Sequence, residues 1–121
     1  QIAEYLSSIG VNLVIGSHPH VIEPIAYVGD TLVIYSLGNF ISAQHPLGIN
    51  MIIGLFVGVD IVVDDGKVSF ENLNYELLYT YCTSGYRNFS VIPFSKLDDA
   101  HLPNHEAINE EWLAIVKSEG L

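Results

Sequence analysis

The sequence predicts an α/β (α+β) fold in which most strands are antiparallel and helices flank the sheets. Apolar residues recur at helical spacing near both ends of the chain, period-two alternation fills the middle, and two-residue turns separate the alternating segments. A chain of 121 residues supports one hydrophobic core. We therefore expect a single domain, or the C-terminal portion of a larger one, over residues 1–121.

Acidic residues dominate the charge of the chain. Fourteen Asp and Glu stand against four Lys and Arg, which gives a formal net charge of −10. A surface of this sign repels phosphate backbones and anionic membranes, so we expect no nucleic-acid partner. Half of the residues are hydrophobic, a composition typical of a folded domain. The longest apolar run, over residues 51–63, is too short to span a bilayer.

The N-terminal segment predicts a helix and then a buried strand. Four apolar residues at helical spacing precede Gly10, which stands where a left-handed helix end would fall: Ile2, Tyr5, Leu6 and Ile9. We expect this helix to dock on a sheet. The continuous apolar run 13–15 suits a strand covered on both faces. The chain starts at Gln1 inside the helical pattern and shows no signal sequence, so we expect part of a longer protein.

The middle of the chain predicts antiparallel strands. Gly29-Asp30 is a hairpin turn between residues 25–28 and 31–36. Residues 51–63 are apolar on both faces, which predicts a central strand, and Asp65-Gly66 turns the chain back into residues 67–70. Shorter strands are expected over residues 73–81 and 89–94. The long loop over residues 37–50, between the predicted strands 31–36 and 51–63, is of a kind that often borders sites.

The last residues predict a helix over about 104–118, with Asn104 as its cap. Cys82 is the only cysteine, so no internal disulfide can form. We expect Cys82 to be a small buried apolar group, as free cysteines usually are.

His18 and His20 are candidate metal ligands. Pro19 fixes φ near an extended value, so we expect both histidines in extended backbone with their rings on the same side, about 6.5 Å apart along the chain. They follow the carboxyl end of the first strand, where α/β proteins collect ligands. Two such imidazoles can reach one metal ion, or the two ions of a binuclear pair.

The pattern alone is weak. With five histidines, a His-x-His pair arises by chance in roughly one such chain in five, so an ordinary polar loop stays an alternative. His45, His101 and His105 are expected to be solvated or capping. Asn39, in Ser36-Leu37-Gly38-Asn39-Phe40, is a candidate catalytic residue, because its amide can donate to a bound oxyanion or to a metal-bound water. Alternatively, Gly38-Asn39 only holds a left-handed turn.

The string "VNLVIGSHPHVIEPIAYVGDTLVIYSLGNF" resembles the C-terminal half of the bacterial capsule synthesis CapA family, which is associated with poly-γ-glutamate synthesis and related to calcineurin-like metallophosphoesterases. The resemblance extends over about residues 1–97. It implies part of a four-layer sandwich of two sheets with flanking helices, and a binuclear metal site at the strand ends. Gly16, His18 and His20 fall on the positions of a Gly-x-His-x-His-like string that gives one histidine to each metal.

The resemblance also implies what lies elsewhere. The family's other ligands, an aspartate, a further acidic residue and an Asn-His pair, belong to its N-terminal half, and none of those strings occurs here. The implied full-length protein is a metal-dependent hydrolase or phosphoesterase with two Mn, Zn or Fe ions at the cell surface. This chain alone is then expected to be inactive.

The implied partners are the missing N-terminal half and polyglutamate or its synthesis machinery. Open sheet edges would let the isolated chain self-associate. The alternative is a noncatalytic envelope module that binds the capsule polymer or its synthesis complex.

Overall fold

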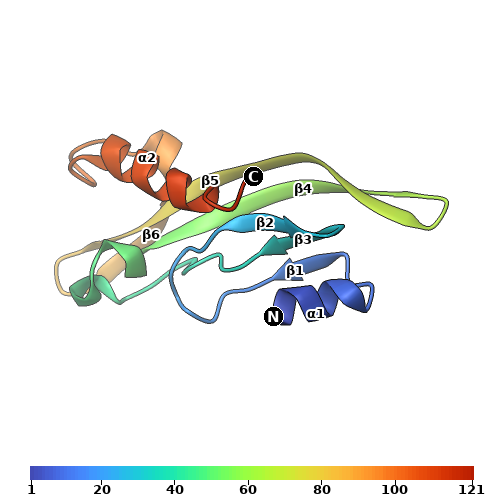
Figure 1. Cartoon of the computed structure of the whole chain (residues 1–121). Helices are drawn as coiled ribbons and strands as arrows, with labels where there is room; N and C mark the ends of the chain where they lie inside the picture. Colours follow the sequence, from blue (N-terminus) through green and yellow to red (C-terminus); the bar gives the residue numbers. More distant parts are fainter.

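The computed structural model describes residues 1–121, apart from the side chain of Pro46. Figure 1 shows the arrangement of the elements. The two α-helices are α1 (Ile2–Ser8) and α2 (His105–Val116), and the strands are β1 (Leu13–Ile15), β2 (Ile25–Val28), β3 (Thr31–Ile34), β4 (Ile53–Asp64), β5 (Lys67–Thr83) and β6 (Arg87–Pro93). Short 3₁₀-helices are η1 (His45–Leu47), η2 (Ile49–Met51) and η3 (Phe94–Lys96).

The strands form two three-stranded sheets. The first has the order β1-β3-β2, with β1 parallel and β2 antiparallel to β3. The second has the order β4-β5-β6 and is antiparallel throughout. The predicted mixed fold with mostly antiparallel strands is therefore confirmed.

Both sheets and α2 share one core. The first sheet contributes Leu32 and Ile34, and β4 and β5 contribute Ile53 and Leu77, all of them buried. Val116 of α2 is fully buried in the same cluster. Within that core, burial raises the pKa of the Tyr79 hydroxyl, with a further rise from the nearby Cys82 and Tyr81.

The predicted hairpin turns are confirmed. Gly29 has φ +60°, as the first central position of a mirror-type turn requires, and β2 and β3 pair on either side of it. Asp65 and Gly66 both have positive φ and connect β4 to β5 in the long hairpin at the right of Figure 1.

The first strand is not covered as expected. β1 pairs only with β3 and lies at the edge of its sheet, and Ile15 is 58% exposed. The prediction of a strand buried on both faces is wrong here, because an apolar run fixes neither its neighbours nor its cover. Successive side chains of a strand point to opposite faces of its sheet, and each face is buried only where another layer packs on it.

The N-terminal helix also contacts less than predicted. α1 lies against the first sheet, and the Ser7 hydroxyl donates to the Val28 carbonyl at 2.7 Å. Only Ala3 of this helix is buried, whereas Ile2, Tyr5 and Ile9 are exposed, Ile2 to 78%. Three of the four apolar residues expected to dock are therefore exposed, and only Leu6 is half-buried.

The strand predicted over residues 51–63 is not central. β4 begins at Ile53 and is the edge strand of its sheet, and β5 is the central one. The second half of β4 is largely exposed, with Val63 at 67%. The separate strands expected over residues 67–70 and 73–81 are one continuous strand, which absorbs a bulge opposite Gly58–Asp60.

The C-terminal helix forms close to its predicted bounds. Asn104 is its N-cap residue, but it has left-handed φ and makes no side-chain capping bond. Among the described residues, neither α-helix has the length and hydropathy required to cross a membrane.

Candidate metal-ligating turn

The candidate site is built where β1 leaves its sheet. Gly16 continues the pairing with β3: its N–H donates to the Ile34 carbonyl at 2.8 Å, and its carbonyl accepts from Leu37 N–H at 3.0 Å. A Cβ on Gly16 would lie 2.1 Å from the Tyr35 carbonyl oxygen, so only glycine fits this close approach. The residues that follow therefore begin from a fixed position.

His18 and His20 lie in a turn, not in extended backbone. The N–H of His20 donates to the Ser17 carbonyl at 3.3 Å, which closes a four-residue turn over Ser17–His20. His20 itself is left-handed, with φ 62°. The prediction of an extended segment is wrong, because Pro19 fixes only its own φ and leaves ψ and the backbone of His20 free to turn.

Both imidazoles are exposed, but only His20 has a side-chain partner among the described residues. His20 Nδ1 lies 2.8 Å from Asn39 Oδ1. The structure thus brings together His20 and Asn39, two of the three predicted site residues. His18 stands on the same turn and makes no side-chain hydrogen bond within the described part of the chain.

Asn39 is held by β4. Gly38 forms an isolated bridge with Gly54, and Leu55 N–H donates to the Leu37 carbonyl at 2.8 Å. A Cβ on Gly54 would lie 2.2 Å from the Asn39 carbonyl oxygen, so the second glycine of this bridge permits the close contact. The position of Asn39 therefore depends on a strand that begins fourteen residues later.

The amide of Asn39 is occupied by protein groups. Its Nδ2 donates toward the His20 carbonyl at 3.2 Å, the Met51 carbonyl at 3.0 Å and Gln44 Oε1 at 3.0 Å. Three acceptors therefore surround two N–H bonds. A catalytic role for Asn39 stays a prediction, and in this arrangement its N–H groups face the protein.

Gln44 is the residue of this site that the sequence did not indicate. Its Oε1 accepts from Asn39 Nδ2 and lies 3.3 Å from Ser42 Oγ, which in turn accepts from Gln44 N–H at 3.1 Å. Ser42 N–H donates to the buried Thr80 hydroxyl of β5. A glutamine in a polar loop carries no distinctive signal, so only its contacts reveal it.

The remaining histidines each have a partner. His45 Nε2 lies 3.4 Å from Cys82 Sγ, and Cys82 is half-buried. The expectation of a small buried apolar cysteine is therefore wrong, because the thiol is only partly buried and lies beside a ring nitrogen. His45 is neither capping nor fully solvated.

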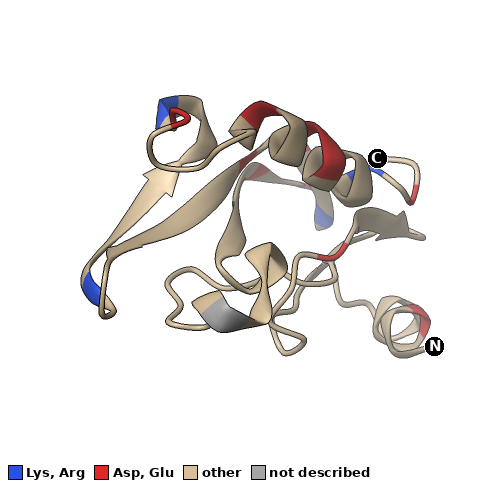
Figure 2. Ribbon diagram, turned by 90° about the vertical axis from the view of Figure 1, so that its left-hand side faces the viewer, with Lys and Arg blue, Asp and Glu red and all other residues tan. Residues whose placement is uncertain are grey.

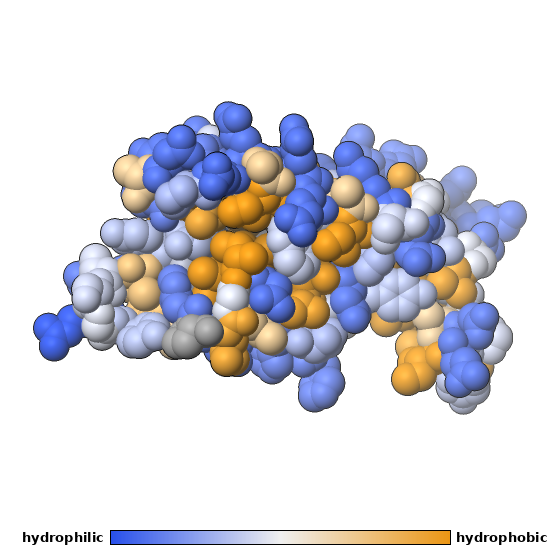
Figure 3. All heavy atoms as spheres, turned by 60° about the vertical axis from the view of Figure 1, so that its left-hand side comes forward, coloured by the Kyte–Doolittle hydropathy of each residue, from blue (hydrophilic) through white to orange (hydrophobic). Residues whose placement is uncertain are grey.

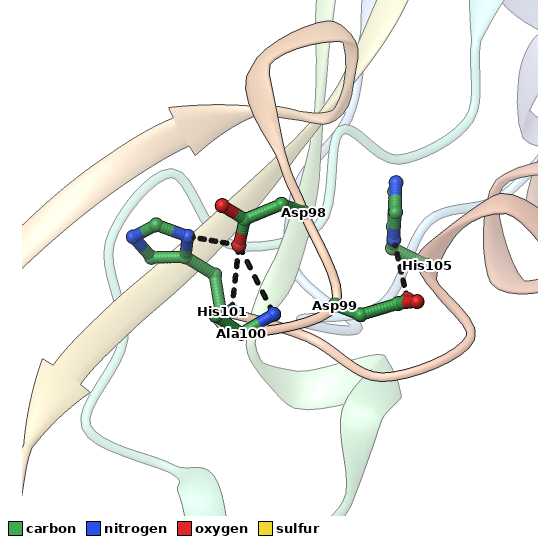
Figure 4. Close-up of polar contacts among 5 residues, drawn as sticks. All are labelled: Asp98, Asp99, Ala100, His101 and His105. Atoms are coloured by element: carbon green, nitrogen blue, oxygen red, sulfur yellow. Dashed lines mark hydrogen bonds and ion pairs between the residues drawn. The ribbon is translucent and has the colours of Figure 1, made fainter.

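The two other histidines pair with aspartates of the loop before α2, as Figure 4 shows. Asp98 Oδ1 accepts from His101 Nδ1 at 2.6 Å and from the backbone N–H groups of His101 and Ala100. The hydrogen bond from the His101 ring, followed by those from the backbone, lowers the pKa of Asp98. His105 Nδ1 lies 3.2 Å from Asp99 Oδ1. These contacts hold the loop together locally.

Within the part of the chain that the structure describes, no three His, Cys, Asp or Glu side chains are grouped closely enough to hold a metal ion. His18 and His20 are therefore two ligands at most. Their imidazole nitrogens suit zinc or iron better than manganese, which prefers oxygen ligands, and two ligands fall short of the three that a catalytic metal normally requires.

Comparison with known proteins finds similarity over a segment that includes this turn. Residues 1–44 match the model of the family described as bacterial capsule synthesis protein PGA_cap. The PGA biosynthesis protein CapA of Bacillus subtilis (strain 168) is 46% identical over 44 residues, which are 36% of this chain and 12% of that protein. No solved structure matches the chain.

The match covers less than half of the range 1–97 over which the resemblance was expected, and it spans only about an eighth of the curated relative. It nevertheless contains His18, His20, Asn39 and Gln44. Over residues 1–44 the chain is therefore similar to bacterial capsule synthesis proteins of the CapA kind.

Proposed function

We propose that this chain is the part of a CapA-like capsule synthesis protein that supplies His18 and His20 to a divalent metal centre. The observation that carries the proposal is the His20–Asn39 pair, in which an exposed imidazole is oriented through Nδ1 by an amide. Metal-ligating histidines almost always donate the N–H of their second ring nitrogen to an oxygen acceptor, most often a carboxylate, a backbone carbonyl or water.

The metal centre needs ligands beyond these two. The described residues supply no third ligand at this turn, so we infer that it comes from polypeptide outside the 121 residues, the N-terminal half of the same protein. β1 offers the place for such a partner, because it lies at the sheet edge directly before the turn and Ile15 is exposed. An open edge next to an apolar surface favours the addition of a further strand.

The roles of the residues follow from their protonation chemistry. His18 and His20 act as neutral ligands and not as bases, and a metal held by them would supply the Lewis-acid chemistry of a metal-dependent hydrolase or phosphoesterase. Two Mn, Zn or Fe ions in the complete protein is the proposed complement. The 121 residues alone are then inactive.

The proposed polymer partner and this chain carry charge of the same sign. Poly-γ-glutamate is a polyanion, and a chain of net charge −10 repels it. We infer that polymer or its synthesis machinery is engaged through bound cations or through a basic surface elsewhere in the protein, at the cell surface. Added poly-γ-glutamate should therefore not bind this chain without divalent cations.

Metal binding by the turn can be tested on the chain itself. Mn²⁺, a paramagnetic ion, should broaden the imidazole NMR signals of His18 and His20 before those of His101 and His105. His20→Ala should abolish the effect at the turn while the circular dichroism spectrum stays unchanged. His105→Ala, which removes a histidine from the α2 side, is the matched control and should leave the broadening intact.

In protein extended to include its N-terminal half, metal analysis should find about two equivalents, with loss on His20→Ala. Equal metal content in the two proteins would contradict the proposal and favour a noncatalytic envelope module that binds the polymer or its synthesis complex.

A further inference from the structure

The orientation of the Asn39 amide is determined by backbone groups. Nδ2 lies 3.2 Å from the His20 carbonyl oxygen and 3.0 Å from the Met51 carbonyl oxygen. Carbonyl oxygens only accept hydrogen bonds, so the group facing them must be the NH₂ and not the amide oxygen. A flipped amide would place oxygen against two oxygens, and this alternative is thereby excluded.

The tautomer of His20 follows from that orientation. Asn39 Oδ1 faces His20 Nδ1 at 2.8 Å and only accepts, so Nδ1 must carry the hydrogen. A neutral ring protonated on Nδ1 has its lone pair on Nε2. Nε2 has no partner among the described residues, and the side chain is exposed.

Gln44 extends this chain of contacts to the core. Its Oε1 accepts from Asn39 Nδ2 at 3.0 Å, and Ser42 joins Gln44 to the hydroxyl of Thr80, a residue that is 1% exposed. The amide nitrogen of Asn39 therefore donates to two backbone carbonyls and to the side chain of Gln44. Gln44 is itself connected to β5 through Ser42. An exposed histidine receives its orientation from the buried strand.

We propose that Asn39 and Gln44 are positioning residues that hold His20 as the Nδ1-protonated tautomer, with Nε2 as the ligand nitrogen. The metal part of this inference rests on the proposed function, whereas the tautomer does not. It assigns Asn39 a role different from donation to an oxyanion. It also makes the two histidines unequal, since His18 has no side-chain partner in the described structure to select its tautomer.

The tautomers can be read directly by long-range ¹⁵N–¹H NMR correlation on the metal-free chain at about pH 8.5, some two units above the ordinary histidine pKa of about 6.5. His20 should show a protonated Nδ1 and a bare Nε2. His18 should show the Nε2-protonated form that a free neutral imidazole prefers, and it serves as the internal control. Spectra of His18→Gln and His20→Gln assign the two rings.

Two variants test the positioning residues. Asn39→Ala should move His20 to the Nε2-protonated form. Gln44→Ala should give a mixture of tautomers, whereas the matched control Gln44→Glu keeps an oxygen acceptor for Asn39 Nδ2 and should preserve the wild-type tautomer. The wild-type spectrum already tests the inference should Asn39→Ala fail to fold.

Nε2-protonated His20 in the wild type, or an unchanged tautomer in folded Asn39→Ala, would overturn the inference. Subsequent addition of Zn²⁺ separates it from the proposed function. A bare Nε2 whose ¹⁵N shift does not respond to Zn²⁺ leaves the positioning roles standing and contradicts metal binding. Zn²⁺ binding by an Nε2-protonated His20 overturns the positioning roles alone.

Discussion

Hydrogen bonds to single side chains determine the local chemistry of this protein. Asp98 receives three hydrogen bonds on one oxygen, two of them from His101, and the pKa of its carboxyl group falls as a result. His20 receives its orientation from one amide oxygen. In each case the partner lies in a loop, where the backbone leaves polar groups free to bond to side chains.

Asp98→Asn should reduce the acid sensitivity of folding. The folded-state pKa of Asp98 is lowered, so its stabilising contribution is present above the ordinary value of 3.8 and is lost as the pH falls through the folded value. Urea unfolding at several pH values between about 2 and about 6 measures this slope. Asp99→Asn, whose parent contacts His105 at 3.2 Å, is the control and should keep the wild-type slope. Equal slopes for wild type and Asp98→Asn would contradict the prediction.

Strands and turns fix where the site lies. The turn that carries His18 and His20 begins at Gly16, which is pressed against β3, and Asn39 is pressed against Gly54 of β4. Gly16 thus allows close contact with the backbone of Tyr35, and Gly54 allows close contact with the backbone of Asn39. The site is formed where these contacts meet, beside the open edge of β1.

Gly16→Ala should destabilise the fold by about 1–3 kcal/mol, because the new Cβ would lie 2.1 Å from a backbone oxygen that cannot move without shifting β3. Gly58→Ala is the matched control, since its Cβ would meet only the side chain of Asn74, which can rotate away. Chemical denaturation compares the two variants. A smaller loss for Gly16→Ala than for Gly58→Ala would show that β3 yields to the added methyl group.

Ile15→Ala and Ile53→Ala should differ strongly although both residues lie in apolar strands. Ile53 is fully buried, so its truncation should cost about 2–5 kcal/mol. Ile15 is 58% exposed, and its truncation should cost less than about 1 kcal/mol. The free energy of unfolding in urea measures both. A large loss for Ile15→Ala would indicate that β1 is covered, for example by a second copy of the chain across its open edge.

The molecule as a whole carries unbalanced charge and uncovered apolar surface. Figure 2 shows acidic residues along α2 at the top and few basic residues anywhere in view. No lysine or arginine forms an ion pair with a carboxylate among the described residues. Figure 3 shows apolar side chains reaching the surface in the middle of one face. Repulsion between like charges destabilises the compact state. The exposed apolar side chains add little hydrophobic stabilisation, because they stay in contact with water.

Salt should therefore stabilise the protein. Between about 0.01 M and about 1 M NaCl the Debye length falls from about 30 Å to about 3 Å, which screens repulsion and has few attractive pairs to weaken. The midpoint of thermal unfolding should rise. Glu110→Gln, which removes a like-charge neighbour of Glu106 on α2, should raise the midpoint at low salt and reduce the effect of salt. A midpoint that falls with salt would contradict this account.

The local elements follow from the sequence because their causes are local. Glycines with positive φ set the turns at Gly29 and Gly66, and apolar spacing sets α2 and β5. The candidate ligands His18 and His20 were identified from their types and from their place after a strand. Their metal role stays a prediction.

Tertiary structure alone decided which surfaces are covered and which polar groups meet. β1 and β4 are both edge strands, although their apolar sequences would suit central strands equally well. The pattern of hydrophobic residues reports the chemistry of a strand and not the number of its neighbours. The contact of His20 with Asn39 joins residues nineteen positions apart, and Gln44 and Met51 complete it from a third segment. Such contacts arise only when separate strands pack together, since no local pattern encodes the distance between them.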